Sequence, residues 1–415
     1  RYVHFFSIRT LIFLSQLSLR QCISLIAKYL IPFASTSSSS RLFTYFPHDI
    51  DCARVFAGNE NYTQSISRFR PTLGNYGLSM SCDRIAARFS TAPALYETYS
   101  IAYAKTVFQD YQFLEQQMWN TYTRANWYCF SIDRKAPEEF QKRMRQLARC
   151  LPNVLIANVS REVFSDGFNQ NYAHLDCMRA LESRHYEYVF LLQNHDILAR
   201  THRSAVVDKE KCPYTRCVEN YPTNLGQLGL CPKSFRGQEL SACRAANITY
   251  MKGSMQALLP KAASDYIVRE IDVTTFVDMF SVYFAGDEQL FPSILTTEAL
   301  KIPGRHTATC AHRHRMLRHV VWFDDKRGKC ASGNKRHGVC VFGLEDLLAL
   351  KNVQPFIINK MLPTFDNGAI QCYNELLLNR SLGIIGVEEG GLANSDYARF
   401  QRELRSADFD PARFV

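Results

Sequence analysis

The chain of 415 residues lacks several short motifs that mark well-known classes of enzyme. It has no G-x-G-x-x-G and no G-x-x-x-x-G-K-[ST], so neither a dinucleotide fingerprint nor a P-loop is supported. A G-x-S-x-G nucleophile motif is also missing. None of the 14 cysteines forms a C-x-x-C pair, which argues against a zinc ribbon and against a thioredoxin-type redox site.

The cysteines instead suggest disulfides made in an oxidising compartment. Residues 207–250 hold four of them and three prolines, which indicates an excursion from the domain pinned by disulfides, with the pairing left open. Cys310, His312 and His314 would share one face of a strand, but no fourth ligand is evident, so a metal site has little support there. Four Asn-x-Ser/Thr sequons agree weakly with a lumenal location: Asn61, Asn158, Asn247 and Asn379.

The composition is that of a folded protein with an uneven distribution of basic charge. A hydrophobic fraction of 47% is ample for the core of one large α/β domain or two ordinary domains. The formal net charge is +10, and between Lys301 and His337 ten Lys or Arg residues stand against two Asp and no Glu. This cluster predicts a docking site for an anion, with a solvated face or a membrane-facing patch as alternatives. Nucleic acid is not expected as a partner, because the cluster contains no nucleic-acid-binding motif.

Strand-like and helix-like segments alternate from residue 96 onward. Strand-like runs cover 96–103, 127–132, 153–157 and 186–192, and apolar residues at helical spacing lie between them. Farther on, the pattern predicts a helix over 255–268, strands over 320–323 and 339–342, and a helix from 344. This order predicts βαβ units and a mostly parallel sheet, which binds ligands at the carboxyl ends of its strands. Asp133 and Asp196 follow two of these strands, although an Asp in this position is often only a turn former.

The stretch with the clearest potential for catalysis is 280–295, FSVYFAGDEQLFPSIL. An aromatic run is followed by Gly286, Asp287 and Glu288, and a second apolar run follows these directly. At least one of the two carboxylates is therefore expected in low-dielectric surroundings, where a general base can be made. The alternative is that one of them caps the first turn of the following helix.

The N-terminal region predicts an attachment to a membrane. Residues 1–33 are apolar but interrupted by Arg9, Arg20 and Lys28, which makes a poor span, although a signal anchor with a basic flank fits. The small polar tract 34–40 predicts a linker or stem. We therefore expect an anchor at 1–33, a stem and N-terminal region at 34–95, a catalytic domain at 96–394 and a charged tail at 395–415.

Several runs, taken in order, resemble the core-2/I-branching β-1,6-N-acetylglucosaminyltransferase family. The resemblance covers roughly residues 96–378. It is carried by NWYCFSIDRKAP at 126–137, LARCLPNV at 147–154, LDCM at 175–178, GDE at 286–288, HGVCVFG at 337–343, NK at 359–360 and AIQC at 369–372.

The resemblance implies a disulfide-bonded α/β fold of the GT-A type, in a type II membrane protein with its catalytic domain in the Golgi lumen. It implies an inverting, metal-independent transfer of N-acetylglucosamine from UDP-N-acetylglucosamine to a galactose or N-acetylgalactosamine hydroxyl of a glycan, by β-1,6 branching. No cofactor is expected besides this donor. In keeping with a metal-free enzyme, Asp408-Phe-Asp410 lies in the tail rather than after a sheet strand.

The resemblance also assigns roles to individual residues. Glu288 looks like the catalytic base that takes the proton of the acceptor hydroxyl. Lys360 looks like a cation for the diphosphate. Some members have an arginine as the other such cation, and this chain has His337 at that position with Arg336 beside it. Because histidine is only partly charged near neutral pH, Arg336 is the alternative source of the charge.

Three more residues complete the predicted substrate site. Asp133 resembles a carboxylate that contacts the uridine, and Trp322 resembles an aromatic residue on the acceptor side, with a place in the core as the alternative. Asp287 is expected beside the base. The resemblance further implies four disulfides: Cys52–Cys372, Cys82–Cys150, Cys129–Cys177 and Cys330–Cys340.

Two other functions remain open from the sequence. A catalytically inactive relative that binds glycan or nucleotide is favoured by His337 and by the interrupted anchor. A glycoside hydrolase would need an acid and a base or nucleophile on opposite sides of one cleft, which two adjacent carboxylates do not supply. The chain also departs from the family over 207–250 and lacks a proline after Asp196, so the acceptor stays undefined.

Overall fold

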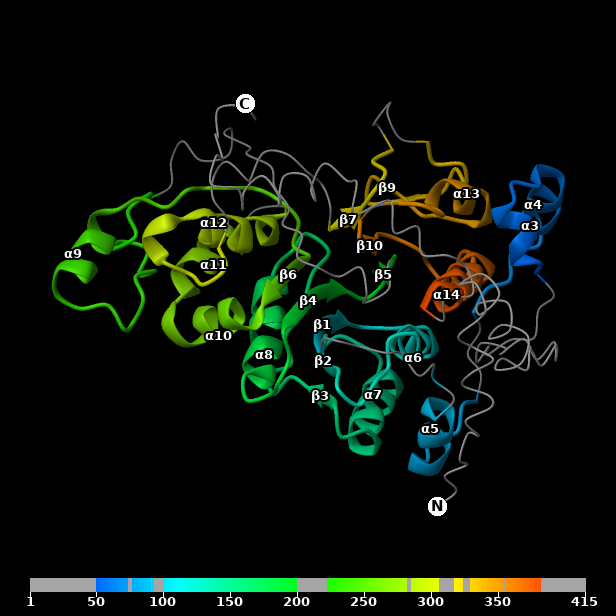
Figure 1. Cartoon of the computed structure of the whole chain (residues 1–415), viewed down its shortest axis with the longest axis horizontal. Coiled ribbons are helices and arrows are strands. Elements are labelled where there is room, and N and C mark those ends of the chain that lie inside the picture. The colour runs from blue at the N-terminus through cyan, green and yellow to red at the C-terminus, as the bar shows by residue number, and fades with distance from the viewer. Residues whose placement is uncertain are drawn as a thin grey trace, which may run out of the picture. The chain divides into compact units, whose positions relative to one another are not determined.

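The computed structural model describes residues 50–73, 77–90, 92, 100–199, 222–281, 285–305, 317–323, 329–353 and 355–381. Five of the strands form a central sheet (Figure 1). Its strand order is β3 (Val154–Ile156), β2 (Trp127–Ile132), β1 (Ile101–Val107), β4 (Tyr188–Gln193) and β6 (Ala257–Pro260). The first four are parallel and β6 pairs with β4 antiparallel. The predicted α/β class and mostly parallel sheet are confirmed.

The helices that connect the parallel strands cover both faces of this sheet (Figure 1). Right-handed crossovers place α6 and α7 on one face, because they join β1 to β2 and β2 to β3, and α8 on the other, because it leads back to β4. These helices are α6 (Tyr111–Trp119), α7 (Glu138–Cys150) and α8 (Gln170–Leu181). The alternation of side chains along β1 turns Ala102 and Ala104 toward α8 and Tyr103 and Lys105 toward α6.

The structure of the segment 255–268 differs from the prediction. The segment 255–268 does not form one helix: β6 occupies Ala257–Pro260 and α10 begins at Lys261 and ends at Glu270. Pro260 precedes the first helical residue, and the strand before it pairs with the edge of β4. Tertiary pairing therefore overrides the helical spacing of residues 257–260. The remaining elements of this region are α9 (Gly237–Ala245), α11 (Thr274–Ser281), η3 (Gly286–Glu288), α12 (Leu290–Thr296) and η4 (Glu298–Leu300).

A second, three-stranded sheet lies at the end of β4. Its order is β5 (Ile197–Leu198), β10 (Ile357–Ile358) and β7 (Arg318–His319), with β10 parallel to β7. The predicted strand at 320–323 is displaced: β7 ends at His319, and Trp322 makes a single bridge to Val339. The C-terminal part also contains the hairpin β8 (Lys335–Arg336) and β9 (Val339–Cys340), followed by η6 (Leu344–Asp346), α13 (Leu347–Leu350) and α14 (Asn367–Ser381).

The N-terminal helices are joined covalently to the rest of the domain. They are α3 (Cys52–Phe56), α4 (Glu60–Ser67) and α5 (Cys82–Phe89). The disulfide Cys52–Cys372 ties α3 to α14, and Cys82–Cys150 ties α5 to α7. All four predicted disulfides are present, and a fifth, Cys231–Cys243, closes part of the cysteine-rich excursion.

No helix within the described ranges is long and apolar enough to cross a bilayer. The predicted anchor at 1–33, the linker at 34–40 and the charged tail at 395–415 lie outside those ranges. So do Cys310, His312 and His314.

Candidate active site

The two adjacent carboxylates lie on a tight turn that we call the acid turn, residues 285–288. Its backbone is held from two sides, because Ala285 N donates to Asp166 O at 2.7 Å and Gly286 packs on the Phe280 carbonyl. A Cβ on Gly286 would lie 2.0 Å from the Phe280 oxygen, so only glycine fits there. The turn therefore has a defined direction for each of its two carboxylates.

Asp287 and Glu288 have different environments. Asp287 is buried, with its carboxylate against the backbone of Gly167. Burial raises its pKa to about 7, and the neighbouring negative charge of Glu288 adds to the rise. Glu288 is partly exposed, and its Oε2 lies 3.3 Å from Nζ of Lys252. Low-dielectric surroundings were expected for at least one carboxylate, and Asp287 has them, whereas Glu288 is the more accessible of the two.

Residues 252–256, which we call the linking segment, connect the acid turn with β7. Gly253 N donates to Glu288 O at 2.9 Å. Ser254 and Gln256, which follow Gly253 in the segment, both contact Arg318. Nη1 of Arg318 donates to Gln256 Oε1 at 3.0 Å and to Ser254 Oγ at 3.3 Å. One short stretch of backbone thus holds both the turn that carries Glu288 and the guanidinium of Arg318.

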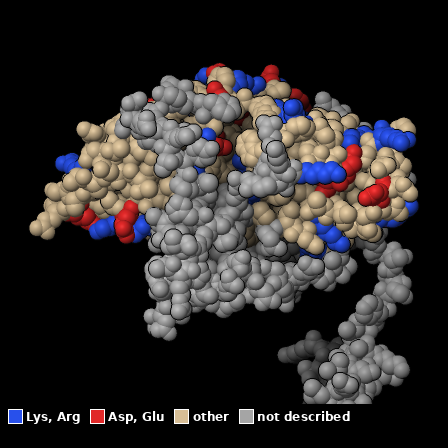
Figure 2. Space-filling view, turned by 90° about the horizontal axis from the view of Figure 1, so that it is seen from above, with Lys and Arg blue, Asp and Glu red and all other residues tan. Residues whose placement is uncertain are grey.

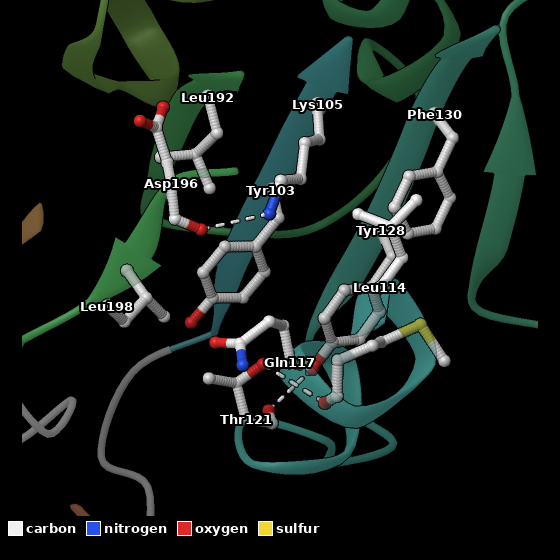
Figure 3. Close-up of a pocket in the computed structure, with 11 residues that line it drawn as sticks. Tyr103, Lys105, Leu114, Gln117, Thr121, Tyr128, Phe130, Leu192, Asp196 and Leu198 are labelled. Atoms are coloured by element: carbon white, nitrogen blue, oxygen red, sulfur yellow. Dashed lines mark hydrogen bonds between the residues drawn. The ribbon is translucent and has the colours of Figure 1, made fainter. Parts of the chain in front are cut away.

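The linking segment also reaches Asp196, the buried carboxylate that follows β4. Gln256 Nε2 donates to Asp196 Oδ2 at 3.0 Å, and Asn359 Nδ2 donates to Asp196 Oδ1 at 2.6 Å. Lys105 Nζ donates to the backbone oxygen of Asp196 at 3.1 Å (Figure 3). Asp196 therefore joins β1, β6 and β10 at the carboxyl end of the parallel strands, which is where the sequence predicted a cleft.

Three cations gather beside this carboxylate, and we call them the cation cluster: Arg318, Arg336 and Lys360. Arg318 lies on β7, and Lys360 follows the adjacent parallel strand β10. Burial lowers the pKa of Lys360 to about 8, and the positive charges of Arg336 and Arg318 act in the same direction, against Asp196. Such mutual repulsion among partly buried cations is relieved when an anion binds between them.

His337 contributes little charge to this cluster. It lies at the tip of the β8–β9 hairpin with φ of 53° and is exposed. Burial, Lys360 and Arg336 lower its pKa below the ordinary value, so the imidazole is mostly neutral near pH 7. The disulfide Cys330–Cys340 closes the loop that carries the hairpin. The structure thus brings Arg336, His337 and Lys360 together, as the sequence predicted.

Charge on the visible surface is mixed rather than uniformly basic. Figure 2 shows Lys and Arg side chains next to Asp and Glu side chains on the face that it displays. Much of the basic stretch lies outside the described ranges, at 306–316 and 324–328. The local cation cluster, and not the net charge, therefore indicates an anion site.

Trp322 is an exposed aromatic side chain at the same hairpin. Its fractional exposure is 43%, so the alternative that it belongs to the core is wrong. The ring lies over Gly338, where a Cβ would be 3.8 Å from the ring carbons. An exposed indole beside the cation cluster's hairpin is suited to the apolar face of a sugar.

Asp133 lies apart from these contacts. It follows β2 and is buried, and its Oδ1 accepts a hydrogen bond from Lys135 N at 2.8 Å. The Lys135 side chain approaches the other oxygen at 3.7 Å. These contacts form the turn that the sequence offered as the alternative role, and they do not join Asp133 to the acid turn.

Three site residues, Lys105, Lys252 and Arg318, were not singled out from the sequence. Lys105 lies in a buried strand and lines a cavity of about 40 Å³ between β1, β2 and α6 (Figure 3). Its burial lowers its pKa to about 8. Lys105 could have been identified from the sequence, because a lysine is unusual within the apolar run of β1. The only sequence feature that pointed to Arg318 was its place in the basic cluster, and no sequence feature pointed to Lys252.

The described residues offer little for a metal ion. The one group of possible ligands found within these ranges is Cys330, Cys340 and Asp346. The two cysteines are bonded to each other, so they have no thiolate to give. No role for a metal is built on this group.

Comparison with known proteins decides the family. Residues 101–351 match the sequence profile of the Core-2/I-Branching enzyme family. The chain belongs to this family.

Curated relatives are similar over most of the chain. A rat β-1,3-galactosyl-O-glycosyl-glycoprotein β-1,6-N-acetylglucosaminyltransferase 3 is 22% identical over 368 residues, or 80% of this chain and 84% of the relative. A mouse N-acetyllactosaminide β-1,6-N-acetylglucosaminyl-transferase is 23% identical over 71% of this chain and 77% of the relative. A human relative with the same name as the rat protein, without its number, is 22% identical over 80% of this chain and 86% of the relative. The predicted family and the predicted class of enzyme, a glycosyltransferase, are confirmed for this core-2/I-branching enzyme.

Proposed function

We propose that the protein is an inverting, metal-independent transferase that moves N-acetylglucosamine from UDP-N-acetylglucosamine to a galactose or N-acetylgalactosamine hydroxyl of a glycan by β-1,6 branching. The observation that carries the proposal is the linking segment, which holds Glu288 at one end and contacts Arg318 of the cation cluster at the other. A base for the acceptor and cations for the leaving group are thereby joined in one contiguous site.

The reaction assigns a separate task to each part of this site. Glu288 takes the proton of the acceptor hydroxyl while that oxygen forms a bond to the anomeric carbon. The bond between the anomeric carbon and the β-phosphate oxygen breaks, and its electron pair leaves with UDP. The negative charge that develops on the diphosphate is stabilised by Lys360 and Arg336, two cations that the protein itself supplies. Trp322 offers its exposed ring to the acceptor, and Asp133 contacts the uridine.

The GT-A-type fold and a lumenal place in the Golgi, on an N-terminal membrane anchor, belong to the same proposal. Five disulfides in the described ranges support an oxidising compartment of the secretory pathway. The mostly parallel sheet with polar groups at its carboxyl edge supports binding of a nucleotide there.

The test measures UDP release from UDP-N-acetylglucosamine with a panel of galactose-ended and N-acetylgalactosamine-ended acceptors, with EDTA present. Release that depends on an acceptor and persists in EDTA is expected for the wild-type protein. Glu288→Gln removes the base without changing the shape of the side chain, and its turnover should fall by about a hundredfold or more. Glu138→Gln, at an exposed position on α7, is the matched control.

Two results would contradict the proposal. Loss of release in EDTA, restored by a divalent cation, would assign the leaving-group charge to a metal. Binding of UDP without any transfer, in wild type and in Glu288→Gln alike, would favour a catalytically inactive relative, with the mostly neutral His337 as the reason.

A further inference from the structure

Arg318 occupies the position between the acid turn and the rest of the cation cluster. It lies on β7, whose neighbour β10 leads directly to Lys360, and Asn359 N donates to His319 O at 3.0 Å. Its guanidinium is oriented by two hydrogen bonds from Nη1 to the linking segment. That segment continues to Lys252 and Gly253, which contact Glu288. The strand β10, which leads to Lys360, and the linking segment, which contacts Glu288, therefore both connect Arg318 to the proposed catalytic site.

The electrostatics of the surrounding groups agree with this placement. Burial and Glu288 raise the pKa of Asp287 in the acid turn, and the charge of Arg318 opposes that rise. Burial lowers the pKa of Lys360, and the charge of Arg318 adds to that fall. A single cation that acts on both groups lies close to the acid turn and to Lys360.

We propose that Arg318 is a fixed cation for the leaving diphosphate and supplies charge that His337 does not. This inference rests on the proposed function and extends it to a residue that the sequence had not singled out. A guanidinium stays charged throughout the physiological pH range and offers planar N–H donors that match phosphate oxygens. His337 is exposed and mostly neutral near pH 7, so its hairpin gives the site less charge than an arginine there would.

The negative charge on the diphosphate grows during the reaction, because the electron pair of the breaking bond moves onto UDP. A contact that strengthens as this charge develops raises kcat more than it lowers the KM for the donor. The same contact strengthens the binding of the product UDP, which carries the diphosphate, and has no effect on uridine, which carries no phosphate. Arg318 can therefore be tested by binding alone, apart from turnover.

The experiment compares the affinity for UDP with the affinity for uridine by titration calorimetry, using the full chain. Arg318→Gln should weaken the binding of UDP tenfold or more and that of uridine less than twofold. Arg318→Lys keeps the charge but loses the planar pair of donors, so UDP should bind threefold or more weakly. Arg145→Gln, at an exposed position on α7, is the control and should leave both affinities unchanged. In turnover, Arg318→Gln should lower kcat more than tenfold with the KM for the acceptor unchanged.

The outcomes separate a functional role from a structural one. Equal weakening of UDP and uridine would mean that Arg318 only holds Ser254 and Gln256 in place, and would overturn the inference. Should Arg318→Gln fail to fold, Arg318→Lys decides: an unchanged affinity for UDP overturns the inference, and a selective loss supports it. If wild-type protein binds no UDP, the proposed function fails, and this inference fails with it. If wild type binds UDP and Arg318→Gln binds it equally well, only this inference fails.

Discussion

Nζ of Lys252 lies 3.3 Å from Oε2 of Glu288, so the proposed catalytic base is paired with a lysine from the linking segment. The side chains of Lys252 and Glu288 are 32% and 20% exposed, which leaves both within reach of solvent or substrate. A partly buried ion pair of this kind restricts the rotamers of the carboxylate. We therefore expect Lys252 to act as a positioning residue for Glu288.

Lys252→Met tests this pairing. Loss of this ion pair should lower kcat about tenfold, which corresponds to about 1.4 kcal/mol in the activation barrier. The KM for UDP-N-acetylglucosamine should change less than twofold, because Lys252 contacts the base and not the cation cluster. Steady-state kinetics with one saturating substrate at a time measures both values. Lys142→Met breaks an exposed pair on α7 and serves as the control. A kcat equal to or above that of wild type would show that the lysine does not position the base.

The buried Asp287 predicts a specific dependence of stability on pH. Burial and Glu288 raise its pKa to about 7, whereas in the unfolded chain an Asp titrates near its ordinary value of about 4. The native state therefore holds the proton more tightly, and between about pH 4 and about pH 7 this group lowers the free energy of unfolding as the pH rises. Asp287→Asn removes this contribution.

Urea unfolding of wild type and Asp287→Asn at several values between pH 4.5 and pH 7.5 measures the effect. The free energy of unfolding of the variant, relative to that of wild type, should increase with pH across this window. Asp83→Asn, on the exposed side of α5, should run parallel to wild type. Parallel profiles for wild type and Asp287→Asn would mean that the Asp287 carboxyl is not perturbed.

Trp322 predicts a separation between acceptor and donor binding. Truncation of its exposed ring in Trp322→Ala should raise the KM for the acceptor about tenfold, the kinetic equivalent of one lost stacking contact. The KM for the donor should stay within twofold, since the exposed ring lies over Gly338 at the tip of the hairpin and is proposed to contact only the acceptor. Kinetics with varied acceptor checks this, and Phe69→Ala removes an exposed ring elsewhere as the control. A rise confined to the donor KM would assign Trp322 to the nucleotide side.

Arg70 ties the N-terminal segment to the C-terminal part of the domain. It forms ion pairs with Glu345 and with Asp366, and the side chain of Asp366 is fully buried. Arg70→Met leaves that carboxylate without its cation, so the free energy of unfolding should fall by about 3 kcal/mol.

Urea unfolding at neutral pH measures the loss. Arg84→Met removes an arginine from the exposed side of α5 and should cost less than about 0.5 kcal/mol. A loss below about 1 kcal/mol for Arg70→Met would show that backbone donors alone satisfy Asp366, which also accepts from Leu344 N and Ala369 N.

Much of the fold was predictable because local periodicity and tertiary structure agree. Strand β2 has the predicted bounds of 127–132. The prediction was wrong at 257–260, where apolar residues at helical spacing pair with the edge of β4 instead. The periodicity of residues 257–260 cannot show that the edge of β4 is available for pairing, since β4 belongs to a different part of the chain.

The candidate site was predictable only in part, for the same kind of reason. Glu288 and Lys360 were identified by resemblance, and the disulfides that hold their surroundings were identified with them. Arg318 and Lys252 were missed, because a basic residue in a basic stretch or in a loop gives no local sign of its contacts.

The sequence by itself determined the α/β class and the carboxylates at the ends of the strands, because these depend on residue type, order and spacing along the chain. Its motifs, taken in order, resemble one family, and that resemblance implied the four disulfide pairs. Only the tertiary structure decided that Asp287 is buried while Glu288 meets Lys252. It also decided that Arg318 stands between the acid turn and Lys360. These relationships join residues that are distant along the chain, because β6 pairs with β4 and β7 pairs with β10, and no local pattern encodes such pairing.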